Sequence, residues 1–256
     1  MTAGPGRTLL VSVAAVGVVI AIWHLVAQDM DPLLLPTPLA VIGAAGELSE
    51  QGRLWDDILV SLQRVYAGWL VGSAIAVPIG LLAGTSTYAR AAVDPFIHFF
   101  RFIPALALTS LFILWFGIGE ASKVNLVVYA VMFIVLVSTA SGAASVSQDK
   151  LLGAQTMGAN RFDLFFRITL PATFSSIFVG MRLALAAAFL VIVAAEAIAA
   201  QEGIGFLIWN ARTFFRTDFV FVGILLFGIL GFLSDRLWKL LGRTVFARYL
   251  TDLGDY

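Results

Sequence analysis

Apolar residues dominate six stretches of the chain, and short polar segments separate these stretches. A helix needs about 20 mostly apolar residues to cross the hydrocarbon core of a bilayer. We therefore predict six spanning helices at about Leu9–Ala27, Val65–Gly84, Phe96–Phe116, Val124–Ala144, Ala172–Ala199 and Phe219–Leu240. The third and fifth stretches also contain charged residues. The pattern indicates an all-α polytopic membrane protein in which residues 1–256 form a single transmembrane domain.

A polar segment interrupts the pattern between the fourth and fifth predicted spans. Residues Gln148–Pro171 read QDKLLGAQTMGANRFDLFFRITLP, and we call this segment the polar loop. Lys150–Met157 can form one short helix that ends at Gly158, because glycine is favoured just beyond a helix C-terminus. The rest of the loop then has room for a second short helix.

The second helix of the polar loop is predicted to be amphipathic. Asn160 can cap it, with Asp163 three residues later in the spacing of a capping box. We expect Pro171 to end it, so that the fifth span begins at Ala172. Phe162, Phe165, Phe166 and Thr169 fall on one side, and Arg161 and Arg167 on the other. The residues alone leave two interpretations: a docking surface for a cytoplasmic partner, or a helix that lies on the lipid surface.

The composition agrees with a membrane protein and excludes several kinds of site. Hydrophobic residues make up 60% of the chain, charged residues make up 12%, and the mean hydropathy is +0.96. Soluble domains carry about 25% charged residues. The absence of cysteine excludes disulfides and thiolate metal sites, and the net charge of zero gives no reason to expect nucleic acid. We see no phosphate-binding loop or hydrolase motif, so we expect neither cofactor nor ATP hydrolysis by this chain.

Basic residues predict how the chain is oriented in the membrane. Six spans place both termini on one side. If that side is the cytoplasm, the inner segments carry nine basic residues against five in the outer segments, in agreement with the positive-inside rule. The nine are Arg7, Arg90, Lys150, Arg161, Arg167, Arg236, Lys239, Arg243 and Arg248, and the five are Arg53, Arg64, Lys123, Arg212 and Arg216. The outer connection at 28–57 is acidic, and a short surface helix is expected from Pro38 to Leu48.

Four residues within the predicted spans are candidates for lining a transport path. Charged groups in a membrane normally pair or face the interior of the bundle. Glu196 can either form a structural pair or line the path. Arg101 precedes Pro104, which disrupts the helix, and can therefore steer an anion or extend toward the headgroups. Arg182 is interpreted as the partner of another charge or of a second subunit.

The spacing of residues in the polar loop carries a family resemblance. Leu152, Gly153 and Ala154 are followed by Gly158 and, after nine further residues, by Ile168, Leu170 and Pro171. This arrangement resembles the cytoplasmic signature EAA-xxx-G-(x9)-I-x-LP of binding-protein-dependent ABC importer permeases. Leu152 replaces the usual glutamate and Gly153 the first alanine, which puts a specific salt bridge to the ATPase in doubt. By this resemblance, these residues form the ATPase-docking surface with Asn160, Arg161, Phe162, Asp163 and Phe165.

Further stretches are similar to the nitrate/taurine/alkanesulfonate branch of this family. They are Pro36–Pro38, Ser61–Val65 with Gly68, Asp94–Pro95, Arg101 with Pro104, Ile113–Lys123, Gly180–Arg182, Ala195–Glu196 and Gly203–Gly205. The resemblance runs from about residue 30 to 248. It weakens in the third and fourth spans, where relatives have more proline and this chain has Ala105, Leu108, Ser110 and Ile134–Leu136.

The resemblance implies a type I ABC importer permease of a bacterial inner membrane, with both termini in the cytoplasm. Two copies are expected to pair around a central path, two ATPase subunits to bind the polar loops, and a solute-binding protein to dock outside. ATP binding and hydrolysis then drive alternating access. The implied cargo is a small anion of the sulfonate, nitrate or taurine type.

A six-helix secondary carrier is the alternative function. Such a carrier could use Glu196 for proton coupling, or Asp94 and His98, which lie four residues apart on one helical face and are interpreted as a local pair. Secondary carriers usually contain internal repeats with matching broken helices. We find no convincing repeat in this sequence, and a scaffold without transport activity is less favoured still.

Overall fold

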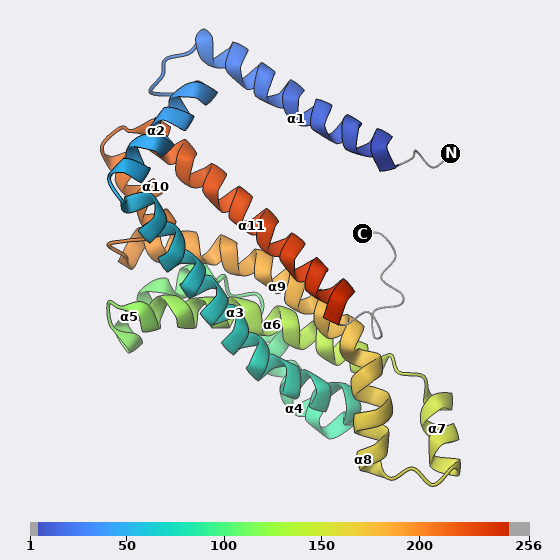
Figure 1. The fold of residues 1–256 in the computed structure, drawn as a ribbon. Coiled ribbons are helices and arrows are strands. Elements are labelled where there is room, and N and C mark those ends of the chain that lie inside the picture. Colours follow the sequence, from blue (N-terminus) through green and yellow to red (C-terminus); the bar gives the residue numbers. More distant parts are fainter. Residues whose placement is uncertain (1–4, 246–256) are drawn as a thin grey trace.

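Every regular element in residues 5–245, the part of the chain that this computed structural model describes, is helical (Figure 1). Short helices lie at both ends of a bundle of long ones. In chain order the elements are α1 (Pro5–Gln28), α2 (Pro38–Glu50), α3 (Arg53–Thr85), α4 (Thr87–Phe100), the 3₁₀ helix η1 (Ala105–Leu108), α5 (Thr109–Phe116), α6 (Glu120–Ala144), α7 (Gln148–Thr156), α8 (Arg161–Asp163), the π-helix η2 (Leu164–Thr169), α9 (Leu170–Ala199), α10 (Ile204–Thr213) and α11 (Thr217–Val245).

Five single helices or continuous helical runs are long and apolar enough to cross a membrane: α1, α3, α6, the run from α8 to α9, and α11. They contain five of the six predicted stretches. α3 begins at Arg53, twelve residues before the predicted start at Val65. Its 33 residues extend over about 50 Å, so α3 is longer than the membrane core is thick.

The third predicted stretch, Phe96–Phe116, is not one straight helix. α4 and the η1–α5 pair are long and apolar enough to cross a membrane only when they are taken together. They are bent by 85° at the break between them. Pro104 lies at this break with φ of −61° and ψ of 128°, an extended conformation that ends helical geometry. Proline has no backbone N–H to donate to a helical hydrogen bond, and its position therefore accounts for the position of the break. The hydropathy pattern does not reveal the bend.

Close packing of α3, α6 and α9 forms the centre of the bundle. Four glycines of α3, at 68, 72, 80 and 84, face α6 so closely that a Cβ atom at each would come within about 3 Å of it. Spacings of four residues between small side chains let membrane helices approach one another. Buried Val127, Val131 and Ala143 of α6 line this contact. Close packing of complementary surfaces therefore joins the apolar lengths of the two helices, and an Arg64–Glu120 ion pair joins them at one end.

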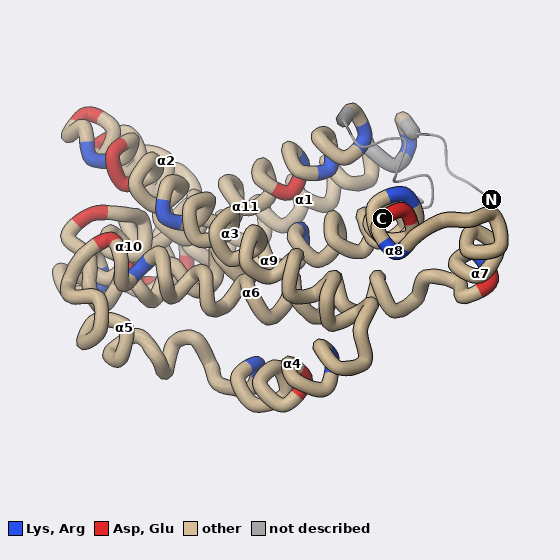
Figure 2. Tube along the Cα trace, turned by 90° about the horizontal axis from the view of Figure 1, so that it is seen from below, with Lys and Arg blue, Asp and Glu red and all other residues tan. Residues whose placement is uncertain are grey.

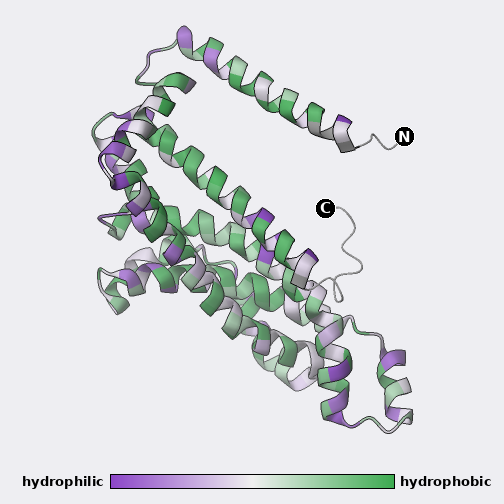
Figure 3. Cartoon of the chain, in the orientation of Figure 1, coloured by the Kyte–Doolittle hydropathy of each residue, from purple (hydrophilic) through white to green (hydrophobic). Residues whose placement is uncertain are grey.

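The ends of the bundle carry most of the charge. The long helices are largely free of charged residues and strongly apolar between their ends (Figures 2 and 3). The start of α1, the end of α11 and the α7–α8 region lie at one end, while α2, α5 and α10 lie at the other (Figures 1 and 2). Residues 1–4 and 246–256, including Arg248 of the predicted basic tail, are outside the described residues.

The predicted surface helix near Pro38 is α2, and it is partly buried. Thr37 caps it, and Val41, Ala44 and Leu48 belong to an apolar core shared with α3, α10 and α11. Glu47 accepts a hydrogen bond of 2.7 Å from Arg216, which lowers the pKa of the Glu47 carboxyl. α2 is therefore an integral part of the end of the bundle opposite the polar loop.

Candidate functional site

The polar loop folds as the predicted helix–turn–helix. α7 ends at Thr156, and Gly158 follows with φ of +88°, which favours glycine. The Asn160 side-chain oxygen accepts hydrogen bonds of 2.9 Å from the backbone N–H groups of Phe162 and Asp163. The Asp163 carboxylate accepts one of 3.4 Å from the Asn160 N–H. The predicted capping box is thus confirmed.

The second helix of the loop continues into the fifth span, so the predicted end at Pro171 is wrong. Helical structure is continuous from Arg161 to Ala199. The π-helix η2 ends two residues before the proline. Its i→i+5 hydrogen bonds widen the turn and make room for a ring that would clash in a regular α-helix. The loop and α9 are therefore joined without an intervening non-helical link.

Aromatic side chains cover one face of this continuous helix near the loop. Phe162 and Phe166 are exposed, with ring centroids 4.3 Å apart. Phe165 packs inward against a small core formed by α3, α6 and α9. Arg161 and Arg167 are both exposed, and Arg167 forms an ion pair of 3.3 Å with Asp163.

The remaining predicted loop residues divide between the surface and the interior. Leu152 and Gly153 are exposed on α7, while Ala154, Ile168, Leu170 and Pro171 are partly buried. A cleft of about 430 Å³ opens between the loop and the ends of α3 and α6, and Gln148, Gln155 and Arg161 line it. The loop thus presents a mixed aromatic and basic surface that the described part of the chain leaves uncovered.

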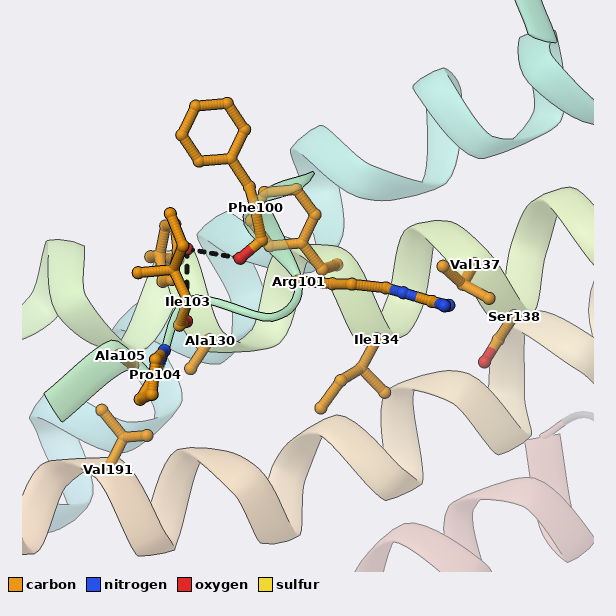
Figure 4. Close-up of a pocket in the computed structure, with 12 residues that line it drawn as sticks. Phe100, Arg101, Ile103, Pro104, Ala105, Ala130, Ile134, Val137, Ser138 and Val191 are labelled. Atoms are coloured by element: carbon orange, nitrogen blue, oxygen red, sulfur yellow. Dashed lines mark hydrogen bonds between the residues drawn. The ribbon is translucent and has the colours of Figure 1, made fainter. Parts of the chain in front are cut away.

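A second candidate site is a groove in the membrane region, where the broken third span faces α6 (Figure 4). Its volume is about 460 Å³. One face of α6 forms its wall, which we call the α6 wall: Tyr129, Ala130, Phe133, Ile134, Val137 and Ser138. Arg101, Pro104 and Val191 complete this side of the groove. The Arg101 side chain extends along α6 toward Val137 and Ser138 (Figure 4).

Tyr129 holds the break in the third span against α6. Its hydroxyl donates a hydrogen bond of 2.7 Å to the Phe100 carbonyl and lies 3.4 Å from the Ile103 carbonyl. Backbone carbonyls released by a helix break need partners in a membrane, because water is scarce there. Tyr129 therefore satisfies the break and fixes the position of Arg101 at the edge of the groove.

Glu196 lies in a buried ionic cluster instead of lining this groove. Its side chain has 0% exposure, and that of Arg64 has 2%. Arg64 donates to Glu196 at 2.8 Å and to Glu120 at 2.6 and 2.7 Å. The Ser61 hydroxyl and the Gly205 N–H each donate to Glu196 at 2.8 Å. The Arg64–Glu196 ion pair corresponds to the structural pair, one of the two interpretations of Glu196 from the sequence.

The same cluster attaches the connection between α9 and α10 to α3. Asp57 accepts a hydrogen bond of 2.6 Å from the Gly203 N–H, and Ser61 accepts one of 2.9 Å from the Ile204 N–H. Gly203 has φ of +115°, and a Cβ atom there would lie 2.6 Å from the Glu196 carboxyl carbon. The glycine is thus required both by backbone conformation and by the close approach of Glu196.

The other predicted ionisable residues have different surroundings. Arg182 forms an ion pair with Asp235 of α11, and the Lys239 ammonium lies 3.7 Å from the same carboxylate. Arg182 is thus the partner of another charge within the chain. Neither a hydrogen bond nor an ion pair joins Asp94 to His98 among the described residues, so the predicted local pair is not formed.

Sequence reasoning missed three residues that organise these sites. Arg64 and Asp235 are charged residues inside or beside apolar stretches, and this alone signals a need for partners. The sequence did not reveal which partners they have. Tyr129 carries no such signal, because a tyrosine in an apolar helix more often serves as packing or as an interfacial anchor.

Comparison with known proteins gives consistent matches over most of the chain. Residues 76–247 match the family described as "Binding-protein-dependent transport system inner membrane component". A probable ABC transporter permease protein of Brucella melitensis is 37% identical over 84% of this chain and 87% of its own. A taurine transport system permease protein of Escherichia coli is 34% identical over 96% and 90%. A putative aliphatic sulfonates transport permease protein of Bacillus subtilis is 35% identical over 88% and 83%.

A solved structure extends the likeness to the fold. A chain of the inward-facing MetNI methionine ABC transporter superposes with a TM-score of 0.60, over 73% of this chain and 95% of that chain. The sequence identity is 16%, so this is a likeness of architecture.

Proposed function

Because the chain belongs to the family of binding-protein-dependent transport system inner membrane components, we propose that it forms the translocation path of an ATP-driven importer for a small anion of the sulfonate, nitrate or taurine type. Family membership makes it a multi-pass inner-membrane transport subunit, not an enzyme, with a type I ABC importer permease fold. The cargo class is proposed from the relatives, whose names include taurine, aliphatic sulfonates and nitrate.

The polar loop is the proposed docking site for an ABC ATPase. The main support is that the second helix of the loop is continuous with α9 up to Ala199. Phe162 and Phe166 on this helix are also exposed. Exposed aromatic residues and arginine are the residue types enriched at protein interfaces. Closure of the ATPase pair would move the loop, and α9 would carry that movement across the membrane. Both termini and the loop are then cytoplasmic.

A solute-binding protein delivers the cargo at the opposite end, and a second permease copy completes the path. The end formed by α2, α5 and α10 carries exposed Trp209, Phe214 and Phe215, which are available for such contacts. The groove of a single chain is lined from one side by the α6 wall, with Arg101 and Pro104 at its edge. We propose that these two residues line the path and that Arg182 and Glu196 support it through their ion pairs.

The secondary carrier has no support from these findings. The first residue considered for proton coupling, Glu196, forms an ion pair with Arg64, an arrangement unlike that of a proton relay. Asp94 and His98 share no hydrogen bond among the described residues.

Affinity purification of the tagged chain from its native membrane tests the proposal. We expect a P-loop ATPase to co-purify with the wild-type chain and to be lost when Arg161 and Arg167 are both changed to glutamate. The control is Arg212→Glu, a charge reversal at the opposite end of the bundle, which should retain the ATPase. Recovery of the chain alone, with uptake intact in vesicles that lack ATP, would contradict the importer.

A further inference from the structure

Within residues 5–245, Arg101 is a cation in the broken third span without a carboxylate partner. Arg64, Lys123, Arg182 and Lys239 of the long helices each have a carboxylate oxygen within 4 Å. Among the described residues, the side-chain contact recorded for Arg101 is the ring of the adjacent Phe102, 4.7 Å from its guanidinium carbon. A charge in a membrane region costs several kcal/mol unless it is paired or faces a hydrated cavity, and such charges typically mark a transport path.

The backbone that carries this unpaired charge is held in place. Tyr129 binds the backbone on both sides of Arg101, at the carbonyls of Phe100 and Ile103. The guanidinium then extends over the groove along α6 (Figure 4). It is therefore presented to whatever occupies the groove.

The surface opposite the guanidinium is apolar. Phe133, Ile134 and Val137 of the α6 wall and Val191 of α9 face the groove, and Ser138 adds one hydroxyl. The lining contains no acidic residue. Its volume of about 460 Å³ lies within the range of sites that hold small organic molecules.

We propose that Arg101 and the α6 wall form a cargo-selecting subsite within the permease, for an organic anion whose charged group pairs with Arg101 and whose apolar body lies against the wall. This rests on the proposed function as an importer and deepens it. An inorganic anion can pair with the arginine but leaves the apolar wall in contact with water. A zwitterion as small as taurine also brings a cation close to Arg101. Selection among anions thus takes place inside the membrane as well as at the binding protein.

The absence of cysteine from the chain allows a direct test of the subsite. Val137→Cys places a single thiol in the wall of the full-length tagged chain, in permeabilised native membrane vesicles. We expect a negatively charged sulfonatoethyl methanethiosulfonate to modify this thiol about tenfold faster than its trimethylammonium analogue, because a local cation concentrates anions. Adding Arg101→Gln should remove the difference, and Arg101→Lys should retain it. Ala121→Cys, at the exposed outer end of α6, is the control. Its modification rates should be the same with Arg101, Arg101→Gln and Arg101→Lys.

Protection by added anions tests the apolar part of the proposal. Hexanesulfonate should slow modification of the Val137→Cys thiol several-fold, and nitrate or taurine at the same concentration should not. Equal rates for the two reagents, unaffected by Arg101→Gln, would overturn the subsite and leave Arg101 as a ligand of lipid headgroups. Protection by nitrate equal to that by hexanesulfonate would overturn selection for an organic anion. The assay needs neither ATP nor a partner, so its outcome is separate from ATPase capture.

Discussion

Arg64 compensates the buried carboxylate of Glu196 and also bonds Glu120 at the end of α6, so one side chain joins three helices. Removing one partner of a buried ion pair typically costs about 3–5 kcal/mol, because the other charge stays buried without compensation. We expect Arg64→Leu to reduce the free energy of unfolding by that amount and Glu196→Gln to cost less, since an amide can keep part of the hydrogen bonding. Thermal unfolding of the purified chain in detergent measures both.

Arg212→Leu is the control for this measurement, because Arg212 stacks on Trp209 at the same end of the bundle without an ion pair among the described residues. An Arg64→Leu variant that unfolds at the same temperature as this control would show that the cluster contributes nothing to stability.

The hydroxyl of Tyr129 supports the break in the third span. Tyr129→Phe keeps the ring and removes the hydrogen bonds to the carbonyls of Phe100 and Ile103. The Phe100 carbonyl keeps a hydrogen bond from the Ile103 N–H, so the expected cost is that of the lost hydrogen bonding, about 0.5–1.5 kcal/mol. We expect a lower unfolding temperature and faster proteolysis at the break. Tyr88→Phe is the matched control on α4, because the Tyr88 side chain is 91% exposed. Equal behaviour of the two variants would contradict the role of the hydroxyl.

At the level of elements, the angle between α7 and α8 depends on Gly158. Its φ of +88° is strained for any residue with a side chain, and most of all for a β-branched one. We expect Gly158→Val to separate ATP hydrolysis from uptake while the spans stay folded, because the turn changes shape and α9 no longer follows the ATPase. The measurement is uptake per ATP hydrolysed in reconstituted vesicles.

Gly17→Val is the matched control for that turn, since Gly17 lies within α1, outside the polar loop, and a Cβ atom there meets open space. The prediction fails if Gly158→Val supports wild-type uptake with the ATPase bound.

Local sequence signals predicted those elements whose cause is local. The apolar stretches located α1, α6 and α11 because lipid selects for composition over about 20 residues. The capping box at Asn160 was predictable because its partners are three residues apart. The disruption at Pro104 was predictable from the proline, but its angle of 85° and the continuation through Pro171 were not, since both depend on how the backbone recovers hydrogen bonds after a proline. Nor could the partners of Arg64 and Arg182 be found, because each is more than fifty residues away.

At the scale of the whole molecule, one helix connects the two functional ends. The run from Arg161 to Ala199 covers 39 residues, or roughly 60 Å. It begins at the polar loop and ends beside Glu196, whose cluster holds the connection to α10. We therefore expect a movement of the loop to reach the opposite end of the bundle through packed helix and a buried ionic cluster. The groove lies between these ends, against α6 and α9.

The orientation of this helix determines which end receives energy and which receives cargo. The positive-inside rule predicts that the polar loop is cytoplasmic and that α2 is external. In a chain without native cysteine, Glu50→Cys at the end of α2 should react with a membrane-impermeant maleimide in intact spheroplasts, and Gln155→Cys on α7 only after permeabilisation. Both side chains are exposed, so a difference in labelling reports sidedness rather than burial. Labelling of Gln155→Cys in intact spheroplasts would show that the polar loop is external. An ATPase in the cytoplasm could then not dock on the polar loop.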